Sequence, residues 1–187
     1  PLAADDAAFD AAFAAVWELF ASAEAYEQFE DGRRLLAWAR SERPGLQVCA
    51  ISNVHEVYRD AVLPRLGLEA YLDFGLYSRV ECVAKPDRAI FLRAAARAGV
   101  DPSEVLHVGD HPIKDATGAR DAGCRALLLD RAGALAPPDG VESISSLDDV
   151  RRWIESSSPN ASAPETGERA LAESHEDERE FSAWLAE

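Results

Sequence analysis

The chain has 187 residues, of which 48% are apolar, and this is enough for one domain of ordinary size with a sizeable core. Its formal net charge of −15 repels phosphate backbones and anionic lipid surfaces, and no cluster of Lys and Arg interrupts that field. We therefore expect neither a nucleic acid nor a membrane as partner, and no apolar run is long enough to span a bilayer.

The cysteines and the first residue bear on where the chain works. Cys49, Cys82 and Cys124 are widely spaced and form no C-x-x-C pair, so we expect free thiols in a reducing compartment and a cytoplasmic location. The sequence contains no methionine and begins with Pro1, which we interpret as a sign of either a piece of a longer product or an incomplete gene model. The lack of a signal peptide therefore carries little weight about targeting to an organelle.

The N-terminal residues predict two helices. From Asp5 to Phe29 the chain is rich in alanine and repeats apolar residues at three-to-four spacing, which is typical of an amphipathic helix. Asp31-Gly32 interrupts this pattern, and a second helix is expected from Arg33 to Ser41. Arg43-Pro44-Gly45 then predicts a turn.

The middle of the chain alternates apolar strands with helices. In chain order we expect strand Leu46–Ile51, helix Glu56–Leu66, strand Phe74–Tyr77, helix Pro86–Ala98, strand Val105–Val108, helix Lys114–Ala122 and strand Ala126–Leu129. Continuous apolar strands between helices indicate an α/β fold, in which helices cover both faces of a parallel sheet.

The C-terminal part predicts one more helix and a tail. Ser146-Leu147-Asp148-Asp149 is a capping sequence for a helix that reaches about Ile154. Ser156–Ser174 is too polar to bury a core, and the final Phe181, Trp184 and Leu185 fit a docking helix as well as an unstructured end. We therefore divide the chain into residues 1–29, an α/β core at 30–155 and an acidic flexible tail at 156–187.

Three polar motifs adjoin the predicted strands. Ser52-Asn53 follows the first strand, Lys85-Pro86-Asp87 begins a capped helix, and Asp110 and Asp115 lie on one short loop after the third strand. Taken singly, these are a helix cap, a surface lysine and turn aspartates. Because ligand sites in open α/β sheets lie outside the carboxyl ends of the strands, we interpret them together as one site.

In order and type, Ile51-Ser52-Asn53, Lys85-Pro86-Asp87 and Gly109-Asp110 through Asp115 resemble the second, third and fourth motifs of the haloacid dehalogenase superfamily of phosphohydrolases. The resemblance covers roughly Asp31 to Asp130. It implies a Rossmann-like three-layer core with a parallel sheet, and it makes residues 1–29 the remnant of a helical cap.

The resemblance also implies roles for individual residues. Ser52, Asn53 and Lys85 would bind the phosphate of a small phosphorylated substrate, and Asp110 and Asp115 would hold Mg²⁺. Lys85 and Asp115 are the expected catalytic residues of this chain. His107 we interpret as a core histidine, His55 as a residue of a first helical turn, and His111 as a first-turn residue rather than a base.

The family's first motif, a strand that ends in Asp-x-Asp and supplies the nucleophile, does not precede Ser52. Asp5-Asp6 lies in a helical pattern, and Asp130 ends a strand but is followed by Arg131-Ala132. In the family the nucleophile strand lies between the strands that end at Ser52 and Asp110. We therefore expect Leu46–Ile51 and Val105–Val108 not to pair with each other.

The function that follows is a Mg²⁺-dependent phosphatase of a small phosphorylated metabolite, inactive as this chain because the nucleophile is absent. Its partner would be the missing N-terminal part of the parent protein. The alternative is a catalytically dead scaffold or interaction subunit of the same fold. A third hypothesis is carbon–halogen hydrolysis, which in this family does not require Mg²⁺. The sequence gives neither the substrate nor the oligomeric state.

Overall fold

The structure is a computed structural model that describes residues 6–20, 22–55 and 57–157. The expected tail lies outside these residues from 158 onward, as do Phe181, Trp184 and Leu185, and its first two residues belong to the last helix. Within the described ranges, no helix has the length and apolar character needed to cross a membrane.

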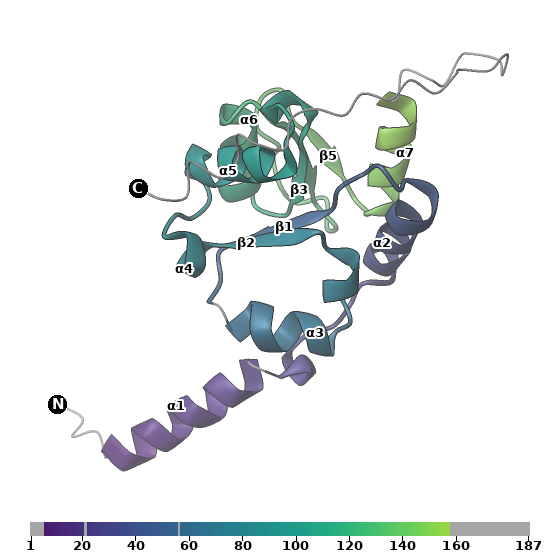
Figure 1. Ribbon diagram of the computed structural model, residues 1–187. Helices are drawn as coiled ribbons and strands as arrows, with labels where there is room; N and C mark the ends of the chain where they lie inside the picture. Colours follow the sequence, from purple (N-terminus) through teal and green to yellow (C-terminus); the bar gives the residue numbers. More distant parts are fainter. Residues whose placement is uncertain (1–5, 21, 56, 158–187) are drawn as a thin grey trace, which may run out of the picture. The chain divides into compact units, whose positions relative to one another are not determined.

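The elements alternate as the sequence predicts (Figure 1). The strands are β1 (Cys49–Ser52), β2 (Phe74–Tyr77), β3 (Leu106–Gly109), β4 (Arg125–Leu129) and β5 (Glu142–Ile144). The α-helices are α1 (Asp6–Phe20), α2 (Glu30–Glu42), α3 (Leu63–Arg65), α4 (Ser78–Glu81), α5 (Arg88–Ala98), α6 (Gly118–Asp121) and α7 (Asp148–Ser157). The described residues also form two π-helical turns, η2 (Tyr58–Val62) and η5 (Pro112–Thr117), and three 3₁₀ turns, η1 (Ala23–Ala25), η3 (Glu69–Tyr71) and η4 (Pro102–Glu104).

All strand pairs are parallel, as expected, but the strands form two separate sheets. β1 pairs with β2, and β3, β4 and β5 pair in that order. No backbone ladder joins β1 to β3 in the part of the chain that the structure describes. The prediction that these two strands do not pair is therefore confirmed.

The core has three layers. Ile90, Phe91 and Ala94 of α5 pack with α6 and with residues of β1 and β2, so this helix covers strands of the first sheet. On β4, Leu128 packs with Ala116 of η5, whereas Leu127 faces Val150 of α7 and the half-buried Leu35 of α2. Helices thus cover the second sheet on both faces, which is the predicted α/β arrangement.

Several predicted boundaries are wrong. α1 ends at Phe20 rather than Phe29. Asp31-Gly32 does not break a helix but lies in the first turn of α2. The backbone N–H groups of a first turn have no hydrogen-bond partner within the helix, so these two residues interrupt no helical hydrogen bond there. Asp87 caps α5 by accepting a hydrogen bond from the Ala89 N–H at 2.9 Å, so Pro86 precedes the helix instead of beginning it. The sequence analysis did not predict α4 or β5.

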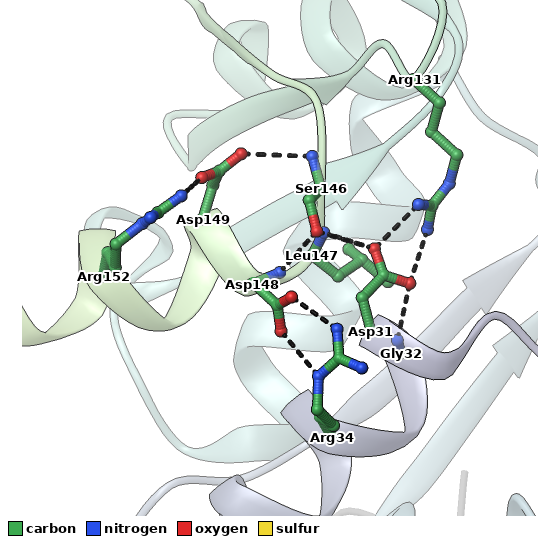
Figure 2. A network of polar contacts seen from close by, with 9 residues as sticks. All are labelled: Asp31, Gly32, Arg34, Arg131, Ser146, Leu147, Asp148, Asp149 and Arg152. Atoms are coloured by element: carbon green, nitrogen blue, oxygen red, sulfur yellow. Dashed lines mark hydrogen bonds and ion pairs between the residues drawn. The ribbon is translucent and has the colours of Figure 1, made fainter.

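A buried carboxylate fixes the start of α2 to the loop after β4 and to α7 (Figure 2). The Arg131 guanidinium donates to both oxygens of Asp31, at 2.8 and 3.0 Å. The Leu147 N–H and the Ser146 hydroxyl also donate to Asp31, at 2.9 and 3.0 Å. The hydrogen bond from Arg131 holds the pKa of Asp31 well below its usual range. These contacts join segments that lie 100 and 116 residues apart in sequence.

Replacing Asp31 by Asn should lower the free energy of unfolding by about 2 kcal/mol, because an amide forms weaker hydrogen bonds with Arg131 than a carboxylate does. Urea denaturation of the chain measures this change. The control is Asp148→Asn, which removes the same charge from the exposed pair with Arg34 in this region and should have a far smaller effect. Equal losses in the two variants would contradict the anchoring role of Asp31.

The rates at which backbone amide hydrogens exchange with solvent should show that β1 and β3 belong to separate sheets. β4 has a partner strand on each side, so we expect its amides to exchange slowly with solvent deuterium. In β1 and β3, which each have one partner strand, alternate amides point away from that partner and should exchange much faster. Hydrogen exchange followed by NMR resolves the alternation, and uniform protection along β1 and β3 would contradict two separate sheets.

Candidate active site

The candidate site lies where β1 and β3 end. Ser52 is the last residue of β1 and Asn53 follows it, while Gly109 is the last residue of β3 and Asp110 follows. Lys85 comes from the segment between α4 and α5. The sequence-predicted residues thus come from both sheets and from the loop that leads into the helix covering the first one.

Asn53 holds Lys85 through the main chain. The Asn53 amide nitrogen donates to the Lys85 carbonyl oxygen at 2.8 Å, and the Lys85 N–H donates to the Asn53 Oδ1 at 2.8 Å. This pair of hydrogen bonds ties the lysine backbone to the end of β1. The Asn53 side chain is therefore used for positioning, which leaves its backbone N–H for a ligand.

The Lys85 ammonium contacts the predicted acidic residue of the other sheet. Lys85 Nζ donates to Asp115 Oδ1 at 2.6 Å, and the two side chains are 13% and 6% exposed. His107 Nε2 lies 3.0 Å from the same oxygen, and the His111 N–H donates to Oδ2 at 3.1 Å. Both oxygens of Asp115 are thus engaged, and one of them faces two basic side chains.

These contacts decide the charge of Asp115. Burial opposes its ionisation, but the hydrogen bonds from His107 and Lys85 outweigh burial and hold the pKa below its usual range. A carboxylate whose pKa is lowered by folding stabilises the protein above its unfolded pKa of about 4, and this stabilisation is lost as the pH falls further. Asp115 is therefore ionised at neutral pH and matches the lysine charge.

Gly109 gives the Asp115 side chain its place. A Cβ on Gly109 would lie 2.3 Å from Asp115 Cγ, which no real contact allows, so the carboxylate packs directly against the glycine backbone. His111 is the N-cap of η5, and its Nδ1 accepts hydrogen bonds from the backbone N–H groups of Ile113 and Lys114. His111 is therefore the residue that caps η5, one position before the first turn in which the sequence analysis expected it.

Two carboxylates remain for a metal ion. Asp110 is exposed at the end of β3, and Asp115 lies five residues further on with its oxygens occupied. No group of three His, Cys, Asp or Glu side chains suited to a metal occurs among the described residues. Mg²⁺ in phosphate-transfer sites typically uses one or two carboxylates and completes its shell with water and substrate phosphate. Asp110, with Asp115 through a water molecule, fits such an open site.

The structure joins some predicted site residues and leaves others apart. Asn53, Lys85 and Asp115 form one chain of hydrogen bonds. No hydrogen bond in the described ranges links the side chain of Ser52 or of Asp110 to these three residues. Asp130, considered as a possible nucleophile, accepts the Leu135 N–H at 2.7 Å and so serves its own loop.

His107 belongs to the candidate site, although sequence reasoning placed it only in the core. The sequence predicts a core histidine, and His107 is buried and packs edge-on against Phe91. Its other contact, with Asp115, places it in the site. The available signal was the strand period of two, because His107 and Gly109 lie on the same face of β3 and Gly109 is the residue against which Asp115 packs.

Comparison with known proteins gives one family. A model of the haloacid dehalogenase-like hydrolase family matches residues 2–123. Haloacid dehalogenase-like hydrolase domain-containing protein 3 of Danio rerio is 38% identical over 112 residues, which are 60% of this chain and 45% of that protein. The phosphoserine phosphatase of Thermus thermophilus is 36% identical over 115 residues, or 61% of this chain and 44% of that enzyme.

Among solved structures, a 2-haloacid dehalogenase from Pseudomonas syringae superposes with a TM-score of 0.59 at 32% identity. The match covers 68% of this chain and 53% of that one. The chain therefore spans less than half the length of the two relatives named above and about half that of the dehalogenase.

Gly109→Ala should displace the Asp115 carboxylate and separate it from Lys85 and His107. We expect a loss of about 1 to 3 kcal/mol of stability, which is typical of overpacking, measured by urea denaturation. Gly45→Ala is the control, since no atom lies within 4 Å of a Cβ at that position and it should change stability little. Equal stability of the Gly109 and Gly45 variants would show that Asp115 can move without cost.

Proposed function

Because the chain belongs to the haloacid dehalogenase-like hydrolase family, we propose that it carries the phosphate- and magnesium-binding part of a phosphatase for small phosphorylated metabolites. The observation that supports this most directly is the contact chain Asn53–Lys85–Asp115, which holds one ammonium group at the ends of strands from both sheets. A cation fixed there is what a phosphate dianion requires.

Each residue then has a task that its position allows. Lys85 neutralises phosphate charge, with its backbone fixed by Asn53 and its ammonium oriented by Asp115. The Ser52 hydroxyl and the Asn53 N–H, at the end of β1, hold phosphate oxygens. Asp110 would provide a charged ligand for Mg²⁺, and Asp115 would be a second carboxylate, bound to it directly or through a water molecule. Bound Mg²⁺ would neutralise further charge on the phosphate.

His107 is a positioning residue in this scheme. It shares Asp115 Oδ1 with Lys85, so it limits the rotation of the carboxylate that orients the ammonium. It does not need to contact the substrate to do so.

Hydrolysis requires a nucleophile as well. A phosphatase of this family type transfers the phosphoryl group to an aspartate of an Asp-x-Asp sequence, and no Asp-x-Asp occurs among the 187 residues. The Asp130 carboxylate, which follows β4, accepts backbone N–H groups of its own loop. We therefore propose that this chain binds phosphate and Mg²⁺ but does not turn over a phosphate ester.

One observation favours the alternative function, a scaffold or interaction subunit. α1 exposes a row of large apolar side chains, which include Phe9, Phe13 and Phe20 with more than half of their surface accessible. Phe9 and Phe13 stack on each other, with ring centroids 6.3 Å apart. A surface of this kind suits a protein partner. Carbon–halogen hydrolysis is a third possibility, which a requirement for Mg²⁺ would reject.

Ligand protection distinguishes the proposals. With Mg²⁺ and inorganic phosphate together, the melting temperature of the chain should rise, because both bind only the folded state. Asp110→Asn should remove the part that depends on Mg²⁺, since an amide brings no negative charge to the metal. Asp139→Asn, an exposed loop residue outside the site, is the control. An unchanged melting temperature would support the scaffold.

Turnover is measured on the same samples with a phosphate monoester, and we expect none from the chain alone. Fusion of an upstream Asp-x-Asp strand should restore activity that depends on Mg²⁺ and is lost in Asp110→Asn. Hydrolysis by the unmodified chain, abolished by Asp110→Asn, would contradict the proposed division of labour.

A further inference from the structure

A cavity of about 360 Å³ adjoins the candidate phosphate site. Its walls come from the loop after β1, from α4 and from the segment before Lys85, and they include Asn53, His55, Ser78, Arg79, Cys82 and Val83. Asn53 belongs both to this cavity and to the hydrogen bonds that hold Lys85. A molecule whose phosphate lies at Lys85 would therefore place the rest of itself in this cavity.

The charge of the cavity contrasts with that of the chain. The chain carries a net charge of −15, yet no Asp or Glu is among the described residues that line the cavity. One guanidinium group, that of Arg79, is present there. Arg79 is exposed, and no hydrogen bond or ion pair of its side chain occurs within the described ranges. In an acidic protein, a cation without a carboxylate partner beside a phosphate site is suited to a second anionic group.

The remaining walls restrict the size of the ligand. Val54, Val83 and Ala84 offer short apolar side chains, and Ser78 offers a hydroxyl. Trp17 of α1 lies edge-on to His55, with the ring centroids 5.3 Å apart, so an aromatic side chain stands next to the cavity wall. A volume near the lower limit for small-molecule sites suits a compact molecule of a few carbon atoms.

From these observations, and resting on the proposed function, we infer the substrate class: a small phosphate monoester whose alcohol part carries a carboxylate, which pairs with Arg79. One guanidinium matches one carboxylate through two parallel hydrogen bonds. Lys85 and Mg²⁺ bind the phosphate end, while Arg79 selects among phosphate esters by the group at the other end.

The test compares two esters that differ only in that group. 3-Phosphoglycerate carries a carboxylate where glycerol 3-phosphate carries a hydroxymethyl group. Isothermal titration of the chain in Mg²⁺ should show about fivefold tighter binding of 3-phosphoglycerate, the ratio expected for one exposed ion pair. Arg79→Gln should abolish this preference and leave the affinities for glycerol 3-phosphate and inorganic phosphate within twofold of the original.

Arg88→Gln is the matched control. Arg88 is an exposed arginine three residues after Lys85 and does not line the cavity. Arg88→Gln removes the same charge from this region as Arg79→Gln does, but the protein should still bind 3-phosphoglycerate more tightly than glycerol 3-phosphate. Arg79→Lys should retain part of this preference.

Four results would overturn the inference. Equal binding of the two esters by the original chain, or a preference that survives Arg79→Gln, would reject it while phosphate binding and the proposed function stand. Loss of inorganic phosphate binding in Arg79→Gln would assign Arg79 a structural or phosphate role instead. If the original chain binds no inorganic phosphate, the proposed function fails and this inference fails with it.

Discussion

The 2.6 Å contact between the Lys85 ammonium and the Asp115 carboxylate joins two sheets that share no backbone hydrogen bond in the described chain. Asn53 fixes Lys85 to the end of β1, and Gly109 allows Asp115 to pack against the end of β3. A buried ion pair alone is weak evidence of stability, because desolvation offsets much of the attraction. Here the carboxylate also accepts hydrogen bonds from His107 and His111, so both of its oxygens are satisfied. The same contacts that link the sheets hold a cation where a phosphate can bind.

Much of this arrangement could be predicted from the sequence, because it depends on local signals. Apolar runs predicted the strands β1 to β4 to within a few residues, and the order of the polar motifs placed Asn53, Lys85 and Asp115 together. The remainder depends on contacts distant in sequence. β5 has only one inward-facing apolar residue, Ile144, and therefore has almost no pattern of its own. Asp31-Gly32 resembles a helix break until Arg131, a hundred residues later, supplies the charge that buries the carboxylate.

Two buried aspartates, Asp31 and Asp115, make tertiary contacts in different parts of the fold. Asp31 connects α2 with the turn before α7, and Asp115 connects the sheets at the candidate site. Both have a lowered pKa for the same reason, a basic partner and additional hydrogen bonds. Between them they supply tertiary contacts where the sheets provide no continuous ladder. The candidate phosphate site is therefore part of what holds this chain together, so ligand binding and folding stability should be coupled.

A double-mutant cycle on Lys85→Met and Asp115→Asn tests the central claim most directly. The free energies of unfolding of the original chain, both single variants and the double variant give the coupling between the two side chains, measured by urea denaturation. If the pair bridges the sheets, the coupling should be about 2 kcal/mol, and each single variant should also lose the protection that inorganic phosphate gives against heat. Additive losses, with phosphate protection intact in Asp115→Asn, would show that Lys85 and Asp115 act independently and would contradict the account.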